Sequence, residues 1–334
     1  MGILLLAGCG QGSDTDTAGR GAEDAEPKQQ LEITINGYSD PENVGILMAE
    51  EQGYFAEAGL EITIRKPIIP PRPIRYLAEG EVDFAVSHQP QVALANDRGL
   101  PLVAVASLVP DPTAAMIWLK RSKIGGIAEL RGKTIGVPGL PFQREFLKSA
   151  LGQAGLTFAD VKVEDVGYEL VPDLLGGRVD AIFGGSWNVE GAELESRGLE
   201  PVITRVEDLG IPAYEELVLV TRRGLLDKRP EAIGDFIAAV ERGNAAALED
   251  PEAATQAILE GVAERDPTLD PTDEADRKAV ETAVEATSPL LSRTGSMNPA
   301  RARELIEWMQ EEGMIRRELP VSTLLTNRYW KPRS

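Results

Sequence analysis

Short apolar segments alternate with amphipathic segments along this sequence from residue 31 onwards. Its first strands are expected at residues 31–35, 60–64, 82–86 and 102–106, with helices near 43–52, 72–79 and 90–97 between them. A chain that alternates strands with helices folds as an α/β protein, because each helix carries the chain back across one face of a mainly parallel sheet. The alternation therefore predicts an α/β lobe at the start of the chain.

The alternation is interrupted after Trp118 and then resumes as a second, smaller set of elements. Strands are expected there at residues 133–137, 161–166 and 180–183, with helices near 142–154, 170–176 and 188–197. An apolar strand at 216–221 returns the chain to the first lobe. Residues 230–334 are mostly helical by period, with prolines near the segment starts.

The departure from one lobe and the return to it give the chain two connecting segments. Two connections make a hinge, and a hinged pair of lobes binds its ligand in the cleft between them. At 334 residues the chain is long enough for two domains. We expect a first lobe from residues 31–118 and 217–334, with the helical C-terminal part packed on it, and a second lobe from 119–216.

A single Cys and a single His limit the chemistry of the chain. Neither a Cys/His zinc site nor a disulfide framework can be assembled from them within one chain. No Ser/His/Asp set, phosphate loop or metal cluster is evident in the sequence, so we expect no catalysis, no metal and no cofactor. The formal net charge of -20 opposes binding to a nucleic-acid backbone.

The lone Cys9 follows a short apolar run at the start of the sequence. Leu6-Ala7-Gly8-Cys9 resembles a bacterial lipobox, in which the cysteine becomes the acylated first residue. The run is short and has no Lys or Arg before it, so an ordinary signal or an incidental apolar terminus is the alternative. Residues 10–30 are typical of a disordered tether. These features predict a signal remnant at 1–9 and a protein anchored by lipid at the extracytoplasmic face of the cell membrane.

Five motifs in the chain are typical of one family. They are Val86-Ser87-His88-Gln89-Pro90, Gly136-Val137-Pro138-Gly139, Gly167-Tyr168-Glu169-Leu170-Val171-Pro172, Gly184-Gly185-Ser186-Trp187-Asn188-Val189-Glu190 and Gly210-Ile211-Pro212-Ala213-Tyr214-Glu215-Glu216-Leu217. With them, residues 31–330 resemble the substrate-binding proteins of ABC importers for thiamine pyrimidine precursors, within the group that includes sulfonate, taurine and nitrate binders. The resemblance implies a two-lobed periplasmic binding protein fold of type II, an aminopyrimidine ligand and importer permease subunits as partners.

The resemblance also implies a set of ligand-binding residues. An aminopyrimidine presents an amine donor beside a ring nitrogen, so a carboxylate can pair with its edge while aromatic side chains cover its faces. Glu190 suits the first role, and Trp187 with Tyr38 from the other lobe suits the second. The remaining candidates in the motifs and near them are Asp40, His88, Gln89, Pro138, Gly139, Tyr168, Ser186, Asn188 and Tyr214. Pyrimidine binders usually carry Tyr at the position of His88.

The candidate residues and the function both have alternatives. Glu190 is also interpretable as a solvated carboxylate in the first turn of a helix, and Asp40 as a helix N-terminal cap. Trp187 could serve lobe packing, and a lone His88 could be structural. A flavin or an aliphatic sulfonate is the alternative ligand, and a sulfonate would require Arg or several N–H donors. A pyrimidine synthase shares the fold, but it needs a cysteine-rich motif that this chain lacks.

Overall fold

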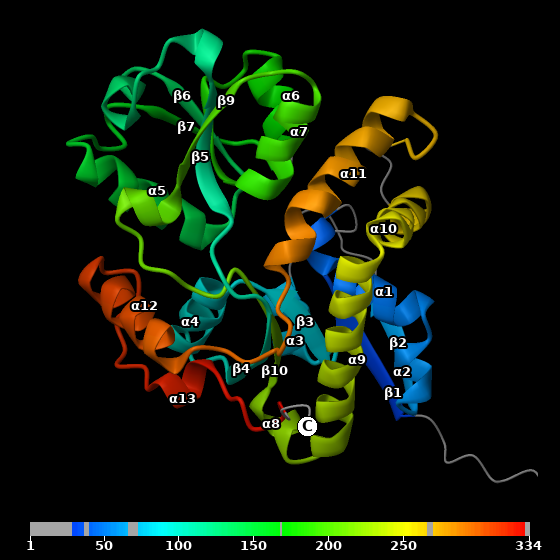
Figure 1. The fold of residues 1–334 in the computed structure, drawn as a ribbon. Helices are drawn as coiled ribbons and strands as arrows, with labels where there is room; N and C mark the ends of the chain where they lie inside the picture. The colour runs from blue at the N-terminus through cyan, green and yellow to red at the C-terminus, as the bar shows by residue number, and fades with distance from the viewer. Residues whose placement is uncertain (1–28, 37–39, 66–72, 168, 266–269, 331–334) are drawn as a thin grey trace, which may run out of the picture.

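The computed structural model describes residues 29–36, 40–65, 73–167, 169–265 and 270–330. Two five-stranded sheets with helices around them form two lobes, one above the other in Figure 1. The first lobe is the lower one in that view, and it contains the beginning and the end of the described chain. Three predicted functional residues, Cys9, Tyr38 and Tyr168, lie outside the described residues.

The first lobe is built on a sheet with the strand order β2-β1-β3-β10-β4. Its strands are β1 (Gln29–Thr34), β2 (Leu60–Arg65), β3 (Phe84–Ser87), β4 (Leu102–Val109) and β10 (Leu217–Arg222). β1 runs parallel to β2 and β3, whereas β10 lies antiparallel between β3 and β4. Every residue of β4 is buried, as expected for a strand with both faces covered.

The second lobe is built on a sheet with the strand order β7-β6-β8-β5-β9. Its strands are β5 (Ala114–Leu119), β6 (Thr134–Val137), β7 (Lys162–Asp165), β8 (Ala181–Ser186) and β9 (Pro201–Arg205). β6 runs parallel to β7 and β8, and β5 lies antiparallel between β8 and β9. The two sheets therefore share one plan, in which four strands run in one direction and one antiparallel strand lies between the third and the fourth.

Helices cover both sheets and fill the C-terminal part. The α-helices are α1 (Val44–Glu51), α2 (Tyr54–Glu57), α3 (Pro73–Glu79), α4 (Gln89–Asp97), α5 (Pro141–Gln153), α6 (Leu170–Leu175), α7 (Ala192–Ser196), α8 (Arg223–Leu226), α9 (Pro230–Glu249), α10 (Pro251–Arg265), α11 (Glu274–Thr287), α12 (Pro299–Glu311) and α13 (Val321–Leu324). The short helices are η1 (Pro41–Asn43), η2 (Lys120–Ser122), η3 (Ile127–Leu130), η4 (Trp187–Gly191), η5 (Val206–Leu209) and η6 (Ser288–Leu290). η4 is a π-helix and the others are 3₁₀-helices.

The two-lobed α/β architecture agrees with the prediction, but the position of one connection does not. β5 pairs only within the second sheet, so the chain first crosses between lobes at residues 110–113 and not after Trp118. All six residues of β5 are buried. A strand covered on both faces has no alternating pattern that would separate it from the preceding lobe. The second crossing, residues 210–216, ends where β10 begins at Leu217.

Helices α9 and α13 of the C-terminal part pack on the first lobe. α9 packs against α1, and α13 packs beside β4 and α4. At the α1–α9 contact the backbones meet directly, because a Cβ added to Gly243 would lie 1.9 Å from the carbonyl oxygen of Gly45. α11 contacts both lobes, since it packs against α10 and η1 and also against α7 and η4 of the second lobe (Figure 1).

Apolar side chains connect the lobes. One buried cluster contains Ala85 and Val220 of the first sheet together with Met116 and Phe142 of the second lobe. The lobes are thus in contact near the crossings in this structure.

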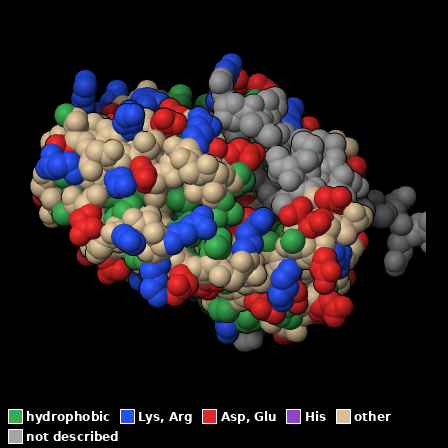
Figure 2. All heavy atoms as spheres, turned by 90° about the horizontal axis from the view of Figure 1, so that it is seen from above, with side chains coloured by type: hydrophobic (Ala, Val, Ile, Leu, Met, Phe, Trp, Pro, Cys, Tyr) green, Lys and Arg blue, Asp and Glu red, His purple; other side chains and the backbone are tan. Residues whose placement is uncertain are grey.

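The outer surface carries both signs of charge. On the face drawn in Figure 2, Lys and Arg side chains are interspersed with Asp and Glu. Among the described helices, none combines the length and the apolar composition needed to cross a lipid bilayer.

Candidate ligand-binding site

Polar side chains from both lobes gather where the strand ends and the two crossings meet. Asn36, Asp40 and Glu42 follow β1, and His88 follows β3. In open α/β sheets, ligands bind beyond the carboxyl ends of the strands. Thr113 comes from the first crossing, and Glu216 comes from the end of the second. Ser186 ends β8, and the turn after it contributes Asn188 and Glu190. We call this set the interlobe cluster: Asn36, Asp40, Glu42, His88, Thr113, Ser186, Asn188, Glu190 and Glu216.

Glu216 holds the two crossings together. Its Oε2 accepts hydrogen bonds from the backbone N–H groups of Thr113 (2.8 Å) and Ala114 (3.3 Å) and from the Tyr214 hydroxyl (3.1 Å). Its Oε1 lies 2.9 Å from His88 Nδ1, which donates because a carboxylate only accepts. Burial would raise the pKa of Glu216, but the bonds from His88 and from the Thr113 and Ala114 amides outweigh it and lower the pKa.

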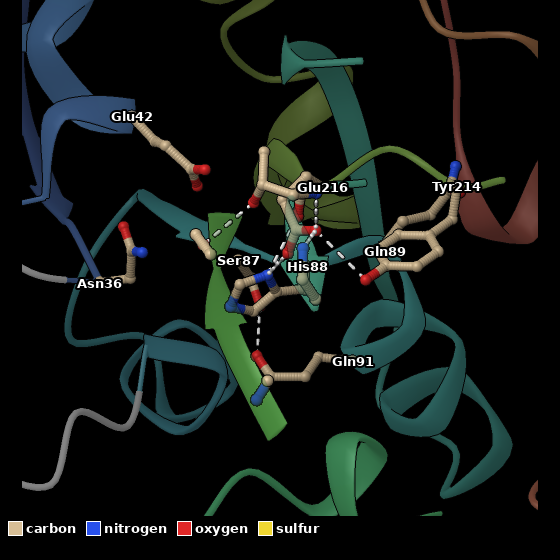
Figure 3. Close-up of polar contacts among 12 residues, drawn as sticks. Asn36, Glu42, Ser87, His88, Gln89, Gln91, Tyr214 and Glu216 are labelled. Atoms are coloured by element: carbon tan, nitrogen blue, oxygen red, sulfur yellow. Dashed lines mark hydrogen bonds and ion pairs between the residues drawn. The ribbon is translucent and has the colours of Figure 1, made fainter. Parts of the chain in front are cut away.

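Two further acids, Asp40 and Glu42, follow β1 on the first lobe. Asp40 accepts from the Glu42 amide (2.9 Å) and from Asn36 Nδ2 (2.7 Å), so it caps η1 as its alternative interpretation predicted. In Figure 3, the side chain of Glu42 extends toward the His88–Glu216 pair. Burial raises the pKa of Glu42 well above its ordinary value, and the nearby charges of Asp40 and Glu216 add to the effect. Glu42 therefore takes up a proton more readily than an exposed glutamate does.

The second lobe contributes the π-helix that follows β8. Ser186 Oγ lies 3.0 Å from Thr113 Oγ1, and the Ser186 amide donates to Glu190 Oε2 at 2.6 Å. Burial raises the pKa of Glu190 to about 7, with a further contribution from the charge of Asp40. The Arg205 guanidinium stacks 4.2 Å above the Trp187 ring. π-helical turns are rare and occur frequently at functional sites.

Asn188 joins three parts of the molecule. Its side chain is fully buried, and its Nδ2 lies 2.8 Å from Thr287 Oγ1 of α11 and 3.3 Å from Glu42 Oε1 of the first lobe. Its Oδ1 is buried and has no hydrogen-bond partner among the described residues. The residue predicted as a ligand contact therefore also has a role in packing the lobes together.

Four other predicted residues lie around the cluster. Gln89 is fully buried and bonded to the backbone of Glu215, and Tyr214 is fully buried with its hydroxyl on Glu216. Both support the second crossing. Pro138 and Gly139 form the turn between β6 and α5, where Gly139 has a φ of 82°.

Sequence reasoning missed Asn36, Glu42, Thr113 and Glu216 as site residues. Glu216 had a detectable signal, since it directly precedes the four apolar residues 217–220 in a chain expected to return to the first lobe there. Thr113 follows Pro110-Asp111-Pro112, a run that interrupts strand structure and marks the first crossing. Among the described residues, no group of three His, Cys, Asp or Glu side chains could hold a metal ion.

The cluster presents more hydrogen-bond acceptors than free donors. The Thr113, Ala114 and Ser186 amides, the Tyr214 hydroxyl and His88 Nδ1 are all engaged by glutamates. Asn36 and Asn188 each use the amide nitrogen on an acid, and within the described chain the buried oxygen of each amide lacks a partner. The site therefore suits a ligand that donates hydrogen bonds. An anion would face four carboxyl groups there.

Comparisons with known proteins agree with the motifs. Residues 40–254 match the family described as NMT1/THI5 like. The formylaminopyrimidine-binding protein of Halalkalibacterium halodurans is 34% identical over 259 residues, which cover 78% of this chain and 76% of that protein. A Haemophilus influenzae protein named for thiamine biosynthesis is 32% identical over 294 residues, covering 87% of this chain and 90% of that protein. Synthases of 4-amino-5-hydroxymethyl-2-methylpyrimidine phosphate are 24–26% identical.

A solved structure supports the fold. The periplasmic aliphatic sulphonate binding protein of Escherichia coli aligns with a TM-score of 0.68 at 17% identity, covering 91% of this chain and 93% of that chain. At this identity the likeness concerns the fold alone, and it confirms the predicted periplasmic binding protein fold. The family match over residues 40–254 and the two relatives above 30% identity show that the chain belongs to the NMT1/THI5-like family.

Proposed function

We propose that this chain binds an aminopyrimidine of the thiamine-precursor type between its two lobes. The observation that carries the proposal is the composition of the interlobe cluster, in which acids and unpartnered amide oxygens outnumber free donors. An aminopyrimidine supplies the matching amine hydrogens. The formylaminopyrimidine-binding relative, 34% identical to this chain, supports the same ligand class.

The buried carboxyl groups of Glu190 and Glu42 have raised pKa values, which suits such a ligand. An aminopyrimidine edge has one donor, the amine, beside one acceptor, the ring nitrogen. A neutral carboxyl group donates through its O–H and accepts through its carbonyl oxygen, so it can meet both at once. Burial raises the pKa of Glu190 to about 7, so this form is well populated near neutral pH, and burial also raises the pKa of Glu42 well above the ordinary value. Glu190 remains our candidate for the polar anchor, and Trp187 for a ring contact.

The alternative ligands fit the cluster less well. A sulfonate needs several free N–H donors or Arg, and in the interlobe cluster the amides of Thr113, Ala114 and Ser186 are already bonded to glutamates. The charge of Glu216, whose pKa is lowered, would also repel it. A flavin would require a longer apolar cleft. The sole cysteine, Cys9, lies far in sequence from the site residues, so the chain lacks the cysteine-rich motif of a synthase and is a binding protein, not an enzyme.

The cellular setting is a further part of the proposal. Leu6-Ala7-Gly8-Cys9 and the polar segment 10–30 support a lipid anchor at the extracytoplasmic face of the membrane. The fold supports delivery of the ligand to the permease of an ABC importer. These statements extend the lipobox and fold arguments to the location and the partners.

A thermal-shift panel tests the ligand class. The protein is heated with 4-amino-5-hydroxymethyl-2-methylpyrimidine, a formylaminopyrimidine, riboflavin, an alkanesulfonate or nitrate. A ligand at about 100 times its dissociation constant adds roughly 2.7 kcal/mol to stability, so the aminopyrimidines should raise the melting temperature clearly. Stabilisation by the alkanesulfonate alone would overturn the proposal. Mass spectrometry of small molecules extracted from the purified protein gives an independent identification.

A further inference from the structure

Three segments far apart in the sequence meet at one buried amide. Glu42 belongs to η1 of the first lobe, Asn188 to the π-helix of the second lobe, and Thr287 ends α11. All three side chains are buried, with exposures of 4%, 0% and 0%. Asn188 Nδ2 approaches Thr287 Oγ1 at 2.8 Å and Glu42 Oε1 at 3.3 Å. Separation of the lobes would break the hydrogen bond between Asn188 and Glu42, because Asn188 lies on the second lobe and Glu42 on the first.

The orientation of the Asn188 amide follows from its partners. In the structure the amide nitrogen donates to Glu42 Oε1 and to Thr287 Oγ1, and the amide oxygen faces away from both. That oxygen is buried, and no partner for it exists among the described residues. A buried acceptor without a partner costs free energy, so the contact between the lobes is incomplete without a donor.

We propose that Asn188 couples ligand occupancy to closure of the lobes: its amide nitrogen holds Glu42 and Thr287, and its amide oxygen accepts an N–H of the ligand. The inference rests on the proposed function for the chemistry of that ligand. A bound amine removes the unsatisfied acceptor and so favours the arrangement in which the lobes are held together. An open arrangement would leave the oxygen accessible to water, whereas the arrangement seen here leaves it without a partner until a ligand donates to it.

α11 gives the coupling a second attachment point. The helix packs against α10 and η1 on one side and against α7 and η4 on the other. Its last residue, Thr287, contributes the hydroxyl that orients the amide. Thr287 is thus a positioning residue that acts on the ligand only through Asn188.

The experiment removes the hydroxyl and keeps the shape of the side chain. Thr287→Val and Asn188→Ala are compared with wild type and with Thr255→Val, a matched control whose hydroxyl bonds to Pro251 O within α10. Calorimetry and stopped-flow binding use 4-amino-5-hydroxymethyl-2-methylpyrimidine as the probe. Small-angle scattering gives the radius of gyration with and without that probe.

We expect Thr287→Val to weaken affinity about five-fold, mainly through faster dissociation, and Asn188→Ala to weaken it about ten-fold or more. The double variant should lose less than the product of the two, because both changes break one network. The ligand-induced decrease in radius of gyration should shrink in both variants and stay intact in Thr255→Val. Wild-type affinity and wild-type compaction in Thr287→Val and Asn188→Ala would overturn the coupling. Absence of probe binding by the wild type would instead overturn the proposed function.

Discussion

Replacing Glu190 with Leu should weaken ligand binding, whereas replacing it with Gln should keep binding and, above neutral pH, make the ligand-free protein more stable. The buried carboxyl group has a pKa of about 7, raised from an ordinary value of 4.5 chiefly by burial. Gln keeps the size and the carbonyl oxygen that accepts from the Ser186 amide. It removes the charge that is costly to bury. The substitution therefore separates the contribution of Glu190 to ligand binding from its effect on stability.

The size and direction of the effect follow from proton binding. Folded Glu190 holds its proton up to about pH 7, whereas the unfolded chain releases it near 4.5. The folded state thus binds more protons between these values, and wild-type stability falls as pH rises through this window and is constant above it. The two pKa values correspond to a free energy of at most roughly 3 kcal/mol. Glu190→Gln should match wild type near pH 4.5 and exceed it by up to that amount at pH 8. Glu42 is present in both proteins and cancels in the difference.

Urea unfolding at pH 4.5, 6, 7 and 8 measures this difference, with the m-value held to be equal in the two proteins. Glu195→Gln serves as control, because Glu195 lies on the exposed face of α7 and should show no such trend. Calorimetry with the aminopyrimidine should show affinity falling by about ten- to a hundred-fold for Glu190→Leu and staying within about three-fold for Glu190→Gln, whose amide keeps the donor and the acceptor of the neutral carboxyl group. A stability difference that does not change between pH 4.5 and 8 would refute the buried-acid argument. Affinity of Glu190→Leu within about two-fold of wild type would remove Glu190 as the anchor.

Three further predictions concern the hinge, the helix contact and the N-terminus. Glu216→Ala leaves buried donors from both crossings without an acceptor, so it should lower the free energy of unfolding in urea by about 3 to 5 kcal/mol. Tyr214→Phe removes one hydrogen bond and should lower it by about 1 kcal/mol. Equal losses in the two variants would contradict the network. Gly243→Ala should cost roughly 3 kcal/mol or more by the same measurement, because of the approach to the Gly45 carbonyl oxygen. Gly261→Ala, with 3.8 Å to its nearest neighbour, should stabilise by about 0.5 to 1 kcal/mol, and a similar loss in both variants would refute the steric reason. Fatty-acid labelling should tag the wild type and spare Cys9→Ser, and equal labelling would end the lipid-anchor proposal.

The strands that sequence reasoning located were those with a clear change of pattern at both ends. The expected strand at 102–106 corresponds to β4 and that at 216–221 to β10, because apolar residues there are bounded by polar turns. β5 and β9 were missed. β5 is buried at every residue and follows β4 after only four residues, so nothing in its composition assigns it to another sheet. Assignment to a sheet depends on pairing between distant residues, which local periodicity does not contain.

More residues of the interlobe cluster were named from the sequence on the second lobe than on the first. The motif ending in Glu190 holds Ser186 at the start of one turn and Asn188 within it, so a single motif brought these residues together. Glu42 was missed because its burial comes from Asn188 and α11, which lie far along the chain. A Glu after a proline in a first helical turn is ordinary at the surface. Only the fold shows that this one is enclosed and that its pKa is raised.

The insertion of β10 between β3 and β4 also determines the order in which the two lobes can form during synthesis. The strands of the second sheet come from one continuous stretch, residues 114–205, whereas the first sheet needs Leu217–Arg222 before β3 and β4 have their shared neighbour. A nascent chain ending near residue 205 therefore has every strand of its second sheet while the first remains divided, with strand edges unpaired. The lobe that begins the chain is thus the one expected to fold last.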